Sequence, residues 1–120
     1  MKHMILIHND PALEPAHGTP AFDAMMGGFF AANEKIGSGG ILVSGKGLQG
    51  IETATSLRIR GDKAMAMDGP FATTGKYPGG YYVVNVPDLD AALKYAAVLP
   101  SATWGTIEVR PLMDYNPTGN

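Results

Sequence analysis

Apolar residues follow two different periods along this chain, and these periods predict its secondary structure. Residues 4–7 are continuously apolar inside the segment 2–8, a pattern typical of a strand buried on both faces. Residues 53–60 alternate between apolar and charged or polar side chains, which predicts a strand with two unlike faces. Within 20–36 and 89–99, apolar residues recur every three or four positions, so each segment is predicted to form an amphipathic helix.

Prolines, glycines and polar capping residues set the predicted boundaries of these elements. Thr19 precedes Pro20, so its hydroxyl is expected to cap the first helix while the proline takes a position that needs no N–H. Asp88 is expected to cap the second helix, and Pro100 is expected to end it. Gly61 opens a predicted hairpin turn. Further strands are predicted at 41–48, 63–68, 80–86 and 104–110.

The predicted order of elements is β-α-β-β-β-β-α-β, in one domain spanning 1–113 with a C-terminal tail at 114–120. Two helices and an antiparallel sheet in this order predict an α+β fold of the ferredoxin-like kind, with both helices on one sheet face and an extra hairpin. The second face of the sheet then has no helix to cover it.

That uncovered face is predicted to be apolar. Tyr82, Val84 and Val86 alternate with Tyr81 and Val83, so both faces of their strand carry large apolar side chains. A face of this kind is too apolar to remain in contact with water. The simplest cover is a second copy of the chain packed sheet to sheet, so we expect a homodimer whose interface encloses a semi-polar cavity.

Composition and charge narrow the range of partners. The chain has 120 residues, a formal net charge of -2 and no cluster of Lys or Arg, which argues against a nucleic-acid or anionic-membrane surface. Cysteine is absent, so disulfides, thiolate catalysis and cysteine-bound metals are excluded. The apolar run near the N-terminus is too short for a signal peptide or a membrane span. We therefore expect a soluble protein of the cytoplasm.

Three short motifs follow one another in the second half of the chain: Asp-Gly-Pro-Phe at 68–71, Gly-Gly-Tyr-Tyr at 79–82 and Glu-Val-Arg-Pro at 108–111. With these motifs the chain resembles the YCII-related family, and in particular the branch named for its Asp-Gly-Pro-Phe (DGPF) motif. The resemblance spans 1–113 and implies a dimeric α+β barrel. It implies little about activity, although some relatives in the wider superfamily isomerise lactones or dehalogenate small ring compounds.

The chain departs from the family pattern directly after the DGPF motif. Family members commonly carry two glutamates there, whereas this chain has Thr73, Gly75 and Lys76 at the corresponding positions. A site that depended on those carboxylates would be absent from this protein. The resemblance is therefore a better guide to the fold than to a reaction.

Two residues are candidates for acid–base catalysis. His8 ends the first predicted strand two residues before Asp10, and an imidazole titrates near neutral pH. Asp68 precedes Gly-Pro, where a carboxylate either caps the turn or acts as a general base. His17 lies in the loop before the first helix, and we prefer His8 to it. The structural alternatives are an exposed histidine at a strand end and a turn-capping aspartate.

A second group of residues is predicted to bind a ligand. The aromatic rings would wall a pocket for a flat ligand, or pack in the core or the dimer interface. The arginines would hold a carboxylate or phosphate, or pair with a glutamate of the sheet. The candidates are Arg58, Phe71, Tyr81, Tyr82, Glu108 and Arg110.

No cofactor or metal is predicted. The histidines at 3, 8 and 17 lack the spacing of known metal sites, and GSGG at 37–40 precedes a strand instead of opening a helix, unlike a phosphate-binding loop. The leading interpretation is a small-ligand-binding domain without a demonstrated reaction. One alternative is a cofactor-free lyase, isomerase or dehalogenase acting on a small cyclic acid. Another is a non-catalytic dimeric interaction module.

Overall fold

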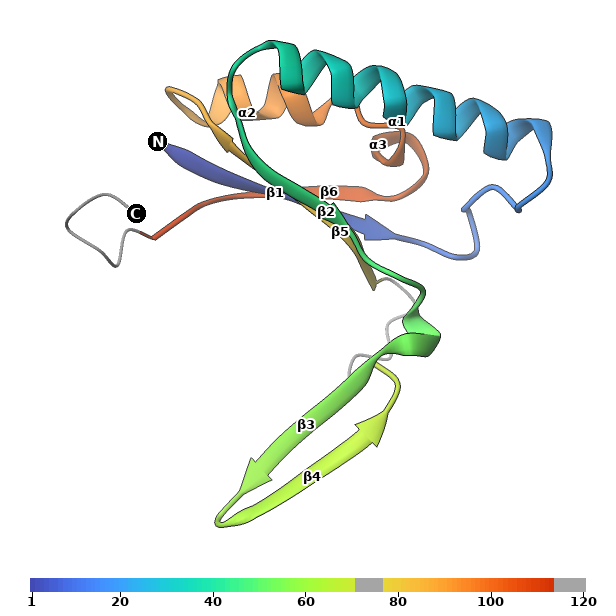
Figure 1. Ribbon diagram of the computed structural model, residues 1–120, viewed down its shortest axis with the longest axis vertical. Helices are drawn as coiled ribbons and strands as arrows, with labels where there is room; N and C mark the ends of the chain where they lie inside the picture. Colours follow the sequence, from blue (N-terminus) through green and yellow to red (C-terminus); the bar gives the residue numbers. More distant parts are fainter. Residues whose placement is uncertain (71–76, 114–120) are drawn as a thin grey trace.

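The computed structural model describes residues 1–70 and 77–113, and its strands and helices follow one another largely in the predicted order (Figure 1). Its helices are α1 (Pro20–Ser38), α2 (Leu89–Ala96) and α3 (Ser101–Trp104), with a short 3-10 turn at Ile51–Thr53. Its strands are β1 (Lys2–Asn9), β2 (Leu42–Gly47), β3 (Thr55–Arg60), β4 (Lys63–Asp68), β5 (Tyr77–Asn85) and β6 (Thr106–Pro111).

Four of the strands form one antiparallel sheet in the order β2-β5-β1-β6, while β3 and β4 form a separate hairpin. All the helices lie on one face of the four-stranded sheet, which we call the helix-side face (Figure 1). The opposite face is the outer face. This arrangement confirms the predicted α+β, ferredoxin-like fold with its extra hairpin.

The hydrophobic core lies between the helix-side face and the helices. Ile5 and Ile7 of β1 and Val84 of β5 point into it, and Ile36 of α1 and Leu99 close it from the other side. Alternate residues of a strand face opposite sides of the sheet, so Leu6 and its alternate neighbours belong to the outer face. The helix-side face is therefore buried within one chain.

Local side chains start both long helices as predicted. The Thr19 hydroxyl accepts a hydrogen bond of 3.2 Å from the Phe22 N–H, and the Asp88 carboxylate accepts one of 2.9 Å from the Ala91 N–H. Each cap satisfies a backbone donor that would otherwise lack a partner at the helix end, which typically stabilises a helix by about 1 kcal/mol.

The segment around Pro100 differs from the prediction. Instead of one helix over 89–99 and a strand from 104, α2 ends at Ala96 and the chain forms the extra single-turn helix α3 before β6 starts at Thr106. Proline cannot continue a helix but can precede a new helical turn, and Pro100 stands at that position. The consequence is that Trp104 lies in a helix on the helix-side face instead of in a strand.

Strand β5 is longer than predicted, because it begins at Tyr77 and includes Pro78. A proline inside a sheet is normally confined to an edge or a bulge, since it lacks the N–H of the ladder. The register between β1 and β5 shifts at Ile7 and His8, and Pro78 lies opposite His8 at this irregularity. The bulge therefore accommodates the proline at the end of a central strand.

The β3–β4 hairpin projects away from the four-stranded sheet (Figure 1). Gly61 adopts a φ of +64° at its turn, a conformation that glycine adopts without strain, in agreement with the predicted glycine-first turn. The pairing runs from Thr55 opposite Asp68 to Arg60 opposite Lys63. Apart from the half-buried Ser56, every residue of the hairpin strands is exposed.

Candidate functional site

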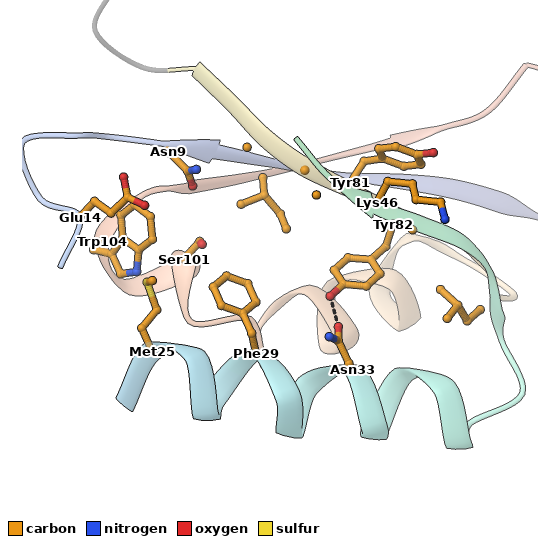
Figure 2. Close-up of a pocket in the computed structure, with 16 residues that line it drawn as sticks. Asn9, Glu14, Met25, Phe29, Asn33, Lys46, Tyr81, Tyr82, Ser101 and Trp104 are labelled. Carbon is orange, nitrogen blue, oxygen red and sulfur yellow. Dashed lines mark hydrogen bonds between the residues drawn. The ribbon is translucent and has the colours of Figure 1, made fainter. Parts of the chain in front are cut away.

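A cavity of about 430 Å³ lies between the helix-side face and α1, and we call it the helix-side cavity (Figure 2). Met25, Phe29 and Asn33 of α1 face the sheet across it. Ser101 and Trp104 of α3 line one end, which we call the Trp104 end. A volume of this size suits a small organic ligand, because typical ligand pockets measure roughly 300–1,000 Å³.

Glycines make room for this cavity in the sheet. Gly80 pairs with Ile7 of the core face and with Gly47 of β2, so Gly80 and Gly47 both lie on the helix-side face. Gly45 pairs with Tyr82 and belongs to the same face. Three neighbouring positions of two paired strands therefore carry no side chain, and backbone forms the floor of the cavity.

The middle of the cavity contains a hydrogen-bonded pair of side chains. The Tyr82 hydroxyl donates to the Asn33 side-chain oxygen and links β5 to α1 (Figure 2). Burial raises the pKa of Tyr82, since removal from water disfavours the phenolate. Tyr82 is thus a neutral donor at physiological pH, and its donor is already used.

The Trp104 end holds two polar atoms of a different kind. The Ser101 hydroxyl oxygen and the Trp104 indole nitrogen are both buried, and neither has a hydrogen-bond partner among the residues that the structure describes. Buried polar atoms without partners are rare in native proteins and call for an explanation. Glu14, from the loop between β1 and α1, also lines the cavity and is drawn at this end in Figure 2.

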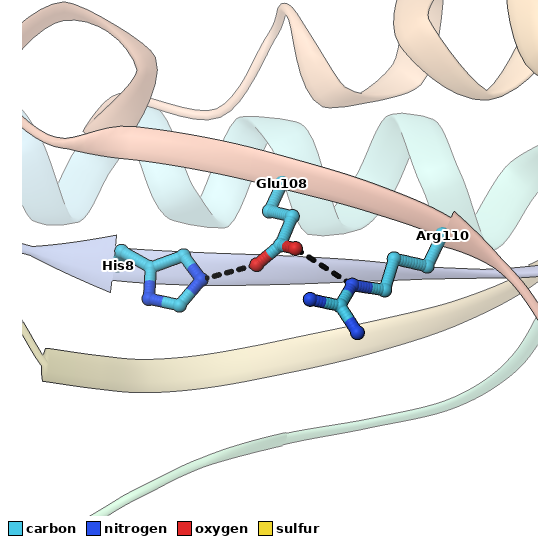
Figure 3. A network of polar contacts seen from close by, with 3 residues as sticks. All are labelled: His8, Glu108 and Arg110. Carbon is cyan, nitrogen blue, oxygen red and sulfur yellow. Dashed lines mark hydrogen bonds and ion pairs between the residues drawn. The ribbon is translucent and has the colours of Figure 1, made fainter.

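The outer face carries a chain of three polar side chains near β6 (Figure 3). His8 Nε2 lies 2.8 Å from one carboxylate oxygen of Glu108, and Arg110 Nε donates to the other oxygen at 2.6 Å. The hydrogen bond from His8, and next the one from Arg110, hold the pKa of the Glu108 carboxyl below its usual range. Glu108 is therefore a carboxylate that orients an imidazole.

Half of the predicted site residues lie on this outer face. His8, Glu108 and Arg110 come together as described, and Tyr81 lies on the same face, because Leu6 pairs with both Tyr81 and Glu108. The sequence could not show that these residues meet, since His8 and Glu108 are 100 positions apart in the chain. Their proximity depends on the register of β5, β1 and β6.

The other predicted residues lie elsewhere. Tyr82 belongs to the helix-side cavity, on the opposite side of β5 from Tyr81 (Figure 2). Arg58 and Asp68 are exposed residues of the hairpin strands. Phe71 and the positions of the missing family glutamates lie outside the described residues.

The helix-side cavity was not predicted from the sequence. Trp104 was assigned to a strand and Ser101 to no element, so their common location on α3 was not expected. One signal was present in the sequence: glycines at 45, 47 and 80, in two segments predicted as strands, indicate missing side chains on a sheet face. Only the register shows that these glycines are neighbours.

Two further searches concern metals and membranes. Within residues 1–70 and 77–113, no group of three or more His, Cys, Asp or Glu side chains is placed to hold a metal ion. None of the helices described there has the length and apolar character needed to cross a membrane.

The fold and the cavity define this chain as a ferredoxin-like α+β protein with a ligand-sized cavity under one helix. Comparison with known proteins identifies its family. The model of the YCII-related domain matches residues 1–116, and the chain belongs to that family. An uncharacterized protein of Rhizobium meliloti (strain 1021) is 32% identical over 119 residues, which cover 98% of this chain and 96% of that protein. Neither the family description nor the name of the relative states a ligand or a reaction.

Proposed function

We propose that this protein binds a small organic ligand and belongs to the DGPF-motif branch of its family. The observation that carries the proposal is the helix-side cavity of about 430 Å³. Proteins bind most small molecules in concave, mainly apolar sites with a few polar groups. The lining has this character, because Met25 and Phe29 supply apolar surface while Ser101 and Trp104 supply buried polar atoms.

The glycine floor supports the same proposal. Glycine weakens a strand, because it loses more backbone freedom on folding and has no side chain to pack. Gly47 and Gly80 nevertheless face each other across β2 and β5, beside the core. A ligand that occupies the space above them would restore the packing that the two strands lack.

Filling the cavity tests the proposal. Apart from its chain neighbours, no atom of the described residues lies within 4 Å of the position that a Cβ of Gly47 would take, so Gly47→Leu adds a side chain above the floor without a backbone clash. Fragments that bind the wild-type protein should shift NMR signals of Phe29, Asn33 and Trp104. We expect Gly47→Leu to lower the affinity for these fragments by about tenfold or more, the equivalent of at least about 1.4 kcal/mol of binding free energy.

The matched control is Gly37→Leu, which adds the same side chain at an equally open position near the end of α1. It should leave fragment binding unchanged, because Gly37 does not line the cavity. Fragments that bind Gly47→Leu as tightly as Gly37→Leu would overturn the proposal.

We also propose that the protein is a homodimer. The chain exposes 8192 Å², whereas a compact monomer of 12.6 kDa exposes roughly 6,200 Å². The exposed hairpin accounts for part of this excess, and a standard interface buries roughly 800 Å² on each partner. Met4, Leu6 and Tyr81 are half-buried residues of the outer face, and they provide an apolar centre there for packing sheet to sheet.

Light scattering at micromolar concentration tests the dimer. We expect twice the chain mass for the wild-type protein and the single-chain mass for Leu6→Lys, which would place a charge at the centre of the outer face. Lys2→Leu is the control, because Lys2 lies at the start of the same strand. A single-chain mass for the wild-type protein would exclude the homodimer.

The His8–Glu108 contact favours an enzyme as the second candidate function. A carboxylate that orients an imidazole is a common arrangement for a general base. The reaction would be a cofactor-free lyase, isomerase or dehalogenase step on a small cyclic acid. If a substrate of this class is turned over, His8→Gln should reduce kcat by about a hundredfold or more. Turnover that is equal in His8→Gln and in the hairpin control Arg58→Gln would exclude His8 as the base.

A cytoplasmic location is proposed on the basis of composition. The chain lacks cysteine, and oxidising compartments favour disulfide-bonded small domains. Fractionation of cells that express the full chain should recover it with cytoplasmic markers, and recovery in the membrane or periplasmic fraction would contradict the assignment.

A further inference from the structure

We infer that the Trp104 end of the helix-side cavity receives a neutral hydrogen-bond acceptor, such as a carbonyl oxygen, on a flat and otherwise apolar ligand. The inference rests on the proposed ligand-binding function and adds the chemical class of the ligand. It starts from Ser101 and Trp104, the two cavity residues that hold a buried polar atom without a partner among the described residues.

The two polar atoms call for the same kind of partner. An indole N–H is only a donor, and a serine hydroxyl is a donor as well as an acceptor. Ser101 and Trp104 are three positions apart in the single turn of α3, and such residues lie on the same side of a helix. One carbonyl oxygen has two lone pairs and can accept from both donors.

The charges around the cavity favour a neutral acceptor over a carboxylate or phosphate. Glu14 lines the cavity at the Trp104 end, so an anion bound there would lie close to a like charge (Figure 2). Among the described lining residues Lys46 is the only cation, and Figure 2 shows it at the opposite end. Lys46 also pairs with Tyr81, so its side chain belongs to the outer face.

The remaining walls favour a flat ligand with little polarity. The floor consists of backbone at Gly47 and Gly80, and Phe29 faces the sheet from α1 (Figure 2). An aromatic or conjugated ring fits between a bare strand surface and a phenyl ring, because flat groups gain contact area and stacking there. The Tyr82 hydroxyl already donates to Asn33 and so does not compete for the acceptor.

Three probes of similar size separate the possibilities: acetophenone carries a neutral acceptor, ethylbenzene carries none, and benzoate carries an anionic one. The chain has a single tryptophan, so one indole N–H signal in a ¹H–¹⁵N spectrum reports on the Trp104 end directly. We expect acetophenone to bind roughly tenfold more tightly than ethylbenzene, the gain typical of added hydrogen bonds. It should also move the indole signal downfield, and benzoate should bind most weakly.

The variant Ser101→Ala sharpens the test. It should lower the affinity for acetophenone several-fold and leave the affinity for ethylbenzene unchanged. The control Thr103→Ala, on the same turn, should change neither affinity. Thr103 is suitable because its hydroxyl already donates to the Pro100 carbonyl and is exposed. The comparison of the three probes on the wild-type protein does not depend on the folding of any variant.

The outcomes distinguish this inference from the proposed function. Equal affinities for acetophenone and ethylbenzene, or tightest binding of benzoate, would overturn the inference of a neutral acceptor. The cavity would still be a binding site. Failure of all three probes to shift the indole signal and the signals of Phe29 and Asn33 would count against the cavity itself, and the inference would fall with it.

Discussion

Ile5 and Ile7 of β1 and Leu57 and Ile59 of β3 are alternate apolar residues on one face of their strands, but the two faces have opposite surroundings. Ile5 and Ile7 of β1 are 0% and 7% exposed, whereas Leu57 and Ile59 of β3 are 63% and 60% exposed. The helices cover the helix-side face, and nothing in the described residues covers the hairpin. Alternation therefore predicts which residues share a face, but burial requires another element to pack on that face.

One face of the hairpin carries apolar side chains from both of its strands. Leu57 pairs with Ala66 and Ile59 pairs with Ala64, so one hairpin face is entirely apolar along these pairs. An isolated two-stranded hairpin is at best marginally stable in water. The radius of gyration is 16.5 Å, compared with about 14 Å for a compact domain of this length, which agrees with a projecting arm. The difference between the two regions can be tested in four ways.

Truncating one apolar side chain in each region should give the largest difference between them in the free energy of unfolding. Ile5→Ala leaves a cavity in the core and should lower the free energy of unfolding by about 2–5 kcal/mol. Leu57→Ala removes an exposed side chain and should change it by less than about 1 kcal/mol. Urea unfolding measures both values. Equal losses would mean that the hairpin is covered in solution, by an interface that the single chain does not contain.

Replacing the turn glycine should affect the hairpin alone. Gly61→Ala forces a side chain into a left-handed conformation, which costs about 1–2 kcal/mol. Amide exchange in residues 55–68 should accelerate while exchange in β1 and β5 stays unchanged. Gly61→Asn is the milder comparison, because asparagine tolerates this conformation. Faster exchange throughout the sheet would show that the hairpin and the sheet unfold together.

Removing the N-terminal cap of α1 should destabilise this helix, which packs on the sheet. Thr19→Ala deletes the acceptor of the Phe22 N–H and should lower the free energy of unfolding by about 1 kcal/mol. Thr19→Ser keeps the oxygen and should restore most of the loss. Thermal unfolding of the three proteins gives the order, and an alanine variant as stable as wild type would rule out a contribution from the cap.

The smallest expected effect concerns the hydrogen-bonded side chains of His8, Glu108 and Arg110 on the outer face. His8→Ala should raise the pKa of the Glu108 carboxyl towards its ordinary value, because the hydrogen bond from His8 is the first cause of the lowering, and Arg110→Ala should raise it as well. NMR titration of the Glu108 carboxyl carbon measures both changes. Arg58→Ala, on the hairpin, is the control. A Glu108 pKa that stays unchanged in His8→Ala would contradict the role of the His8 hydrogen bond.

The same titration has a consequence for stability. Because folding lowers the pKa of Glu108, its contribution is fully present above the pKa of the unfolded chain and is lost as the pH falls through the lowered value. Acid unfolding of His8→Ala should therefore differ from wild type at acidic pH and coincide with it near neutral pH once the difference in neutral stability is subtracted.

Fold and site were predictable to different degrees. Thr19 and Asp88 cap the predicted helices, and the hairpin from Thr55 to Asp68 has the predicted turn, because such features depend on residues close in sequence. Trp104 was placed in a strand, because the helical turn after Pro100 has no strong local signal. The tests of the cavity therefore concern the part of the molecule that local patterns describe least well.

The amino-acid sequence by itself determined most of the strands and helices, their order, the side chains that share a face within each predicted strand, and the family to which the chain belongs. These properties follow from local periodicity, capping and motifs. The tertiary structure alone decided that His8 meets Glu108, that Gly47 lies opposite Gly80, and that Ser101 and Trp104 end a cavity above that floor. The physical reason is that strand register and helix packing bring together residues far apart in the chain, and no local interaction encodes those pairings.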